Sequence, residues 1–180
     1  MADSTPGIEF TTILYGIAAS NALFRISYEA GLRNLMLLFA FVLLATDWLE
    51  YRLSVAAVPD TVDARLRQFG LDMLILVVWT LLTVIPATAV PAYVAVVAAV
   101  VGLQGLWDVL LLESPSPGVF ARAEWAFPVT CGVLLVGDAV VRVRHSLLFV
   151  AVVVLFVGLK ALTWRTLYRR AKREGVALRI

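Results

Sequence analysis

The side chains best suited to chemistry in this sequence are carboxylates that interrupt long apolar runs. Asp47, Asp72 and Asp108 each lie within such a run. A charge in hydrocarbon is costly, so an intramembrane carboxylate either pairs with another group or marks a functional site. Two interpretations follow: pairing between helices, or the wall of an acidic vestibule that concentrates cations at the mouth of an ion path. Asp47 is the strongest functional candidate because it is the deepest carboxylate on an otherwise apolar segment.

A second polar feature lies in the first apolar segment. Polar side chains recur at every fourth position there, at Asn21, Arg25, Glu29 and Arg33. They would share one helical face if the helix continued past Ser27, and a polar stripe in a membrane must face protein or water. The stripe therefore either packs against the second helix or a neighbouring subunit, or lines a water-filled ion path with Asn21 near its narrowest part and Arg25 beside it.

The basic residues suggest three further contacts. Lys160, in the last apolar segment, is the expected partner of a buried carboxylate from another helix. Asp138 and Arg142 are four residues apart and predict a local ion pair. The C-terminal tail is expected to touch anionic lipid or, alternatively, a soluble partner through Arg169, Arg170, Lys172 and Arg173. No nucleic-acid-binding module accompanies this short basic run, so nucleic acid is not an expected partner.

Motifs for catalysis or cofactor binding are absent from the sequence. It contains no HExxH, no GxSxG and no phosphate-binding glycine loop. The single cysteine, Cys131, excludes an internal disulfide and a multi-cysteine metal site, and the single histidine, His145, makes a catalytic triad unattractive. We therefore expect neither an enzyme nor a bound metal or cofactor.

Composition identifies the environment in which these residues must work. Of the 180 residues, 62% are hydrophobic and 16% are charged, with a mean hydropathy of +0.93. Soluble domains are about half apolar and about a quarter charged. These values exclude a disordered chain and a collagen-like repeat, and they indicate a polytopic transmembrane protein. The runs are continuously apolar rather than alternating, which predicts an all-α bundle and not a β-barrel.

Six apolar segments are predicted as membrane helices, each approaching the ~20 residues that a crossing requires. They lie between a short N-terminal tail, 1–7, and a basic tail, 166–180, at residues 8–27, 31–53, 70–85, 92–112, 124–141 and 145–165. A five-helix arrangement, in which the first segment lies on the membrane surface, is the main alternative.

Two local features refine these bounds. The polar connection 54–69 predicts a short interface helix capped by Asp60 or Thr61. Pro128 is expected in the first turn of the fifth helix, where proline is tolerated.

Basic residues and tryptophans predict the orientation. With six crossings both termini share one side, and the segments at or near that side then hold ten basic residues against four on the other. The positive-inside rule therefore predicts that both termini are cytoplasmic, in the cell membrane. Trp48, Trp107, Trp125 and Trp164 would lie near the same interface, the level that aromatic side chains prefer.

The function most consistent with these observations is conduction or transport of a small ion by a homo-oligomer. The chain lacks both catalytic motifs and a sizeable extramembrane segment. The alternative is a non-conducting anchor or sensor subunit of a multi-protein complex.

Overall fold

The computed structural model describes residues 6–26, 30–54, 61–111, 120–141 and 144–174, and within these ranges the side chains of 6–10, 52–54, 108, 120–124, 163 and 166–174 are not described. The described chain is all-helical, which confirms the predicted fold class. It contains six α-helices: α1 (Pro6–Ile26), α2 (Gly31–Ser54), α3 (Val62–Leu82), α4 (Val90–Leu111), α5 (Phe120–Val141) and α6 (His145–Glu174).

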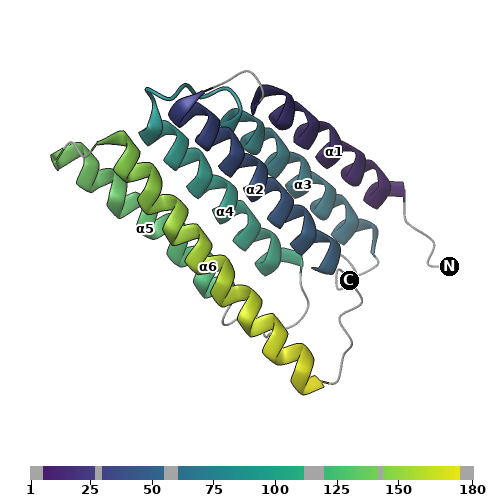
Figure 1. The fold of residues 1–180 in the computed structure, drawn as a ribbon. Coiled ribbons are helices and arrows are strands. Elements are labelled where there is room, and N and C mark those ends of the chain that lie inside the picture. Colours follow the sequence, from purple (N-terminus) through teal and green to yellow (C-terminus); the bar gives the residue numbers. More distant parts are fainter. Residues whose placement is uncertain (1–5, 27–29, 55–60, 112–119, 142–143, 175–180) are drawn as a thin grey trace.

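Consecutive helices run in opposite directions, so α1 begins at the same end of the bundle at which α6 ends (Figure 1). Helix α2 packs against α1, α3 and α6, whereas α4 packs against α3, α5 and α6. Helix α1 lies along both α2 and α3, with Tyr15 and Ala22 buried against them. The first segment is therefore part of the bundle.

Helix α3 begins earlier than the sequence predicted. Thr61 is its N-cap and accepts a hydrogen bond from the Ala64 backbone N–H at 3.2 Å, which agrees with one of the two predicted caps. The helix then runs unbroken through Gly70 to Leu82. The prediction of a separate interface helix is wrong because a single internal glycine costs only about 1 kcal/mol, too little to break a helix whose next turns are strongly apolar.

The end of α1 at Ile26 and the start of α2 at Gly31 lie within one residue of the predicted bounds, and the φ of +62° at Gly31 suits glycine. Arg25 and Arg33 therefore belong to different helices, so the condition for one continuous polar stripe, a helix that continues past Ser27 to Arg33, is not met. The bounds of two other helices differ more from prediction. Helix α5 begins at Phe120, which puts Pro128 inside the helix rather than in its first turn. Helix α6 continues to Glu174 and extends beyond the ends of its neighbours (Figure 1).

The interior of the bundle is aromatic as well as aliphatic. Phe156 makes edge-to-face contacts with Phe39 and Phe127, at centroid distances of 5.3 and 5.9 Å. The Trp79 indole N–H donates to the Ala40 carbonyl at 2.9 Å. Each buried ring therefore packs in a preferred geometry, and the polar end of Trp79 is satisfied.

The outer surface of the bundle is apolar. Large hydrophobic side chains are exposed on every helix, for example Ile17 on α1, Val77 on α3 and Val140 on α5, which is 79% exposed. Three helical segments are long and apolar enough to cross a membrane: Gly31–Tyr51, Val90–Leu111 and His145–Leu162. The described chain therefore has apolar helices compatible with a membrane location.

Candidate functional site: a buried acidic cluster

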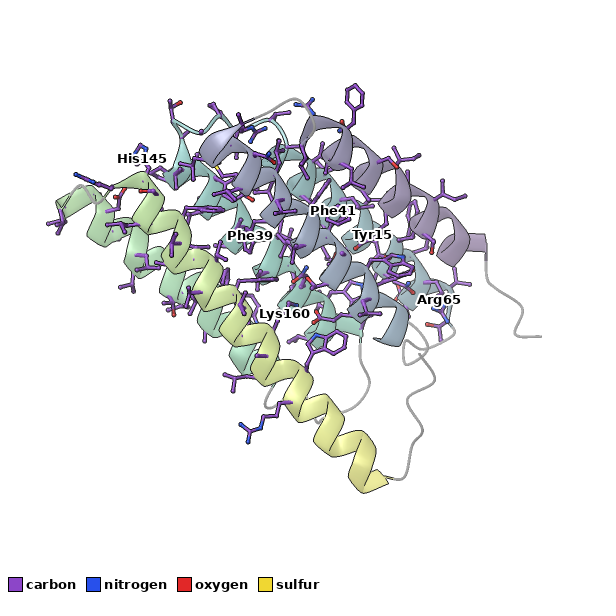
Figure 2. All side chains as sticks on the ribbon, in the orientation of Figure 1. Tyr15, Phe39, Phe41, Arg65, His145 and Lys160 are labelled. Carbon is purple, nitrogen blue, oxygen red and sulfur yellow. The ribbon has the colours of Figure 1, made fainter. Side chains whose placement is uncertain are left out.

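Polar side chains from four helices meet inside the bundle, in the half where α2 and α4 end. They come from α1, α2, α3 and α4 and are all buried, and we call them the acidic cluster: Tyr15, Asp47, Tyr51, Gln68, Asp72, Gln104 and Trp107. Tyr15, from α1, is labelled in Figure 2. Polar groups removed from water need hydrogen-bond partners, so the pairing of each one can be examined in turn.

Asp47 on α2 has a donor for each of its carboxyl oxygens. The Tyr15 hydroxyl of α1 donates to Oδ2, and the Gln104 amide of α4 donates to Oδ1 at 2.7 Å. An ionised carboxylate only accepts hydrogen bonds, and these two donors suit that state. Asp47 thereby ties together three helices.

Asp72 on α3 is less completely paired. The Trp107 indole N–H of α4 donates to its Oδ1 at 2.9 Å. Its second oxygen, Oδ2, is buried and has no hydrogen-bond partner in the described part of the chain. The Gln104 Oε1 atom is also buried and has no hydrogen-bond partner in the described part of the chain. Two acceptor atoms of one cluster therefore lack a donor.

Tyrosine and glutamine side chains connect the two carboxyl groups. The Tyr51 ring stacks on Tyr15 at 6.1 Å and meets Trp107 edge-on at 6.3 Å. The Tyr51 hydroxyl accepts from the Gln68 amide at 3.2 Å, and the Gln68 Oε1 accepts from Arg65 at 3.0 Å. Every member of the cluster is thus in contact with at least one other member.

An ion pair lies next to this cluster. Lys160 of α6 pairs with Glu50 of α2, one helical turn after Asp47, and the two side chains are only 9% and 18% exposed. The Lys160 ammonium also lies 5.6 Å from the centre of the Phe156 ring, a cation–π distance. The lysine that the sequence singled out thus pairs between helices, whereas neither Asp47 nor Asp72 forms an ion pair within the described chain.

The opposite end of the bundle carries a different arrangement, which we call the arginine cap: Arg25, Arg33 and the carbonyls at the end of α3. Arg33 donates to the carbonyls of Leu82 (3.4 Å), Thr83 and Ile85. Arg25 donates to the Thr83 carbonyl at 3.1 Å. Helix C-termini leave carbonyls unpaired and carry partial negative charge, so two guanidinium groups satisfy and neutralise this end.

The predicted path residues do not form one group. Asp47 and Asp72 lie in the acidic cluster, whereas Arg25 lies in the arginine cap. Asn21 is exposed on α1 and accepts a hydrogen bond from Arg25 at 3.4 Å. Asn21 and Arg25 of α1 therefore lie apart from the Asp47 and Asp72 carboxylates.

Several predicted contacts concern side chains outside the described set. These belong to Asp108, Arg142, Arg169, Arg170, Lys172 and Arg173. Of the predicted Asp138–Arg142 pair, only Asp138 is described, and its Oδ1 is buried without a partner in the described chain.

Most of the acidic cluster was not predicted. Gln104 is the one amide side chain in α4, a helix rich in valine and alanine. A single amide in such an apolar helix could have indicated a buried polar contact. Trp107 was expected at the membrane interface, but it is buried and its indole binds Asp72. The contribution of Tyr15 depends on how α1 is rotated against α2, which the sequence does not specify.

Comparison of the chain with protein-family models, with curated protein sequences and with solved structures finds no match.

Proposed function

We propose that this chain is an integral membrane protein that crosses the bilayer six times and moves a small ion, working as a homo-oligomer. Two observations support six crossings. Three segments meet the length and apolarity of a span, and α1, α3 and α5 also expose large apolar side chains outward. A helix that exposes apolar side chains all along the bundle surface is stable when lipid covers it.

The proposed orientation puts both termini in the cytoplasm, in the cell membrane. The alternating direction of the helices supports termini on one side (Figure 1). The excess of basic residues at that side favours the cytoplasm. The acidic cluster then lies in the cytoplasmic half of the bundle, where it can exchange ions with the cell interior.

The observation that carries the proposal is the burial of two carboxyl groups without a basic partner. Asp72 is 2% exposed and Asp47 is 7% exposed. The nearest ammonium group that could serve them, on Lys160, is paired with Glu50. Ionisable groups in this situation are typical of ion pathways and proton relays in membrane proteins.

Reconstitution into liposomes tests this function. We expect purified protein to dissipate an imposed ion gradient, and Asp47→Asn to slow the flux by at least about tenfold, the effect of about 1.4 kcal/mol on a rate. Asp63→Asn is the matched control, because Asp63 lies exposed on α3 in a surface pair with Arg67. Liposomes that stay tight to protons, sodium, potassium and chloride would contradict the proposal.

The length of α6 favours a second candidate, an anchor or sensor subunit. Its 30 residues span about 45 Å, whereas the hydrocarbon core is about 30 Å thick. The surplus carries the four basic residues Arg169, Arg170, Lys172 and Arg173. Trypsin digestion of vesicles separates the two roles of this segment: anionic lipid alone should protect it if it contacts the bilayer. A docking segment would stay sensitive until its soluble partner is added.

A further inference from the structure

We propose that the ion is a proton and that the acidic cluster holds it on Asp72. This inference rests on the proposed function and names its substrate. Four buried side-chain acceptors lack donors in the described chain, and the inference starts from the two that belong to the acidic cluster, Asp72 Oδ2 and Gln104 Oε1. A buried acceptor without a donor is unfavourable, and native proteins contain few of them.

Adding one proton to Asp72 reduces the number of unpaired acceptors in the cluster. Protonation changes Asp72 Oδ2 from an acceptor without a donor into a hydroxyl that donates, while Oδ1 still accepts from Trp107. Protonation thus adds one hydrogen-bond donor to a cluster in which Gln104 Oε1 is an acceptor without a donor. Asp47 needs no proton, because Tyr15 and Gln104 already donate to both of its oxygens.

Both carboxyl groups bind side chains of one helix. Gln104, which binds Asp47, and Trp107, which binds Asp72, are three residues apart on α4, a rise of about 4.5 Å along the helix. Two carboxylates in one buried cluster repel each other, and this repulsion favours a state in which one of them, Asp72, is protonated.

The donors around the carboxyls disfavour a metal cation. The groups that touch Asp47 and Asp72 are an O–H from Tyr15, an N–H from Gln104 and an N–H from Trp107. Their hydrogens carry partial positive charge and occupy three of the four carboxyl oxygens, which leaves Asp72 Oδ2 and Gln104 Oε1 as the only carboxyl and amide oxygens of these side chains open to a cation. No group of three or more His, Cys, Asp or Glu side chains suited to a metal occurs in the described residues.

The described charged side chains next to the cluster have partners of their own. On α2, Glu50 is paired with Lys160 of α6. On α3, Arg65 binds Gln68. The α1 and α2 tyrosines, Tyr15 and Tyr51, are neutral donors or acceptors, and the side chain of Asp108 on α4 lies outside the described set. The charge of the carboxyl pair is therefore set by its own protonation: −1 with one proton and −2 without it.

Infrared spectroscopy tests whether Asp72 is protonated. The purified full chain at neutral pH should show the carbonyl band of a protonated carboxylic acid, and Asp72→Asn should remove it. Asp63→Asn, the same change at an exposed position of α3, should leave the band unchanged. A wild-type spectrum without the band, or a band that persists in Asp72→Asn, would overturn the assignment.

Flux measurements test transport of the proton. Liposomes with an internal pH-sensitive dye should lose an imposed proton gradient, and Asp72→Asn should slow this loss by about 100-fold, the range expected for removing a proton-transferring group. The Asp63→Asn protein should match wild type. Flux of sodium, potassium or chloride without protons overturns this inference and leaves ion transport standing. Absence of every flux contradicts the proposed function itself, so the two failures differ.

Discussion

The two ends of the bundle differ in how completely their buried polar groups are paired. In the arginine cap, the charges of Arg25 and Arg33 meet the carbonyls of residues 82, 83 and 85, and helix termination explains the contacts. In the acidic cluster, Asp72 and Gln104 each keep a buried acceptor without a donor. The contacts of the first end are explained by helix termination, whereas the proposed proton would give the second end a donor that it lacks. If the proposal holds, the arginine cap uses charge for folding and the acidic cluster uses it for function.

The largest loss of stability is expected for a substitution in the arginine cap. Arg33→Leu removes the donor to the Leu82 and Ile85 carbonyls and leaves Arg25 as the donor to Thr83, so it should lower the free energy of unfolding by about 3–5 kcal/mol. Equilibrium unfolding in detergent micelles measures this. Arg33→Lys keeps the charge but not the planar fork of donors, so it should recover part of the loss. A loss below about 1 kcal/mol for Arg33→Leu would mean that water or lipid replaces the cap.

The second effect concerns the ion pair beside the acidic cluster. Lys160→Met leaves Glu50 buried and unpaired and should cost about 3 kcal/mol. Adding Glu50→Gln to Lys160→Met removes the unpaired charge and should recover more than half of that loss. A double variant no more stable than Lys160→Met would show that the ammonium also stabilises Asp47, and would join the pair to the cluster.

The same substitution in two places gives the next comparison. Tyr15→Phe removes a donor from the carboxyl of Asp47 and should cost about 2 kcal/mol, since hydrogen bonds to charged groups are the stronger kind. Tyr93→Phe removes a 2.6 Å bond to the Met36 carbonyl, a neutral acceptor, and should cost about 1 kcal/mol. Equal losses in thermal unfolding would indicate that Asp47 is neutral.

The smallest effect is expected for Asp72→Asn. The amide N–H of asparagine can replace the O–H of a protonated carboxyl, so the loss in unfolding free energy should stay below about 1 kcal/mol. Asp47→Asn is the contrast, because an amide nitrogen cannot accept the bond that one donor now makes to each Asp47 oxygen. If the two variants lose the same stability, the two aspartates share one ionisation state and the distinction between them fails.

The sequence predicted the all-helical class and Thr61 as one of two candidate helix caps, because both depend on local composition. The functional role of Asp47 stays a prediction, and the structure places Asp47 among buried polar side chains. The sequence did not predict the partners Tyr15 and Gln104. Membrane helices are apolar on most faces, so their periodicity does not reveal which face meets a neighbour. Helix rotation is fixed by packing, and only packing brings these side chains together.

Helix α4 supplies one donor to each carboxyl group, Gln104 to Asp47 and Trp107 to Asp72, and also packs against α3, α5 and α6. An axial slide of α4 would break both of these bonds in a single movement, while Tyr15 would still donate to Asp47. If the pair carries the proposed proton, its hold on that proton would depend on the position of α4, and through α4 on α5 and α6.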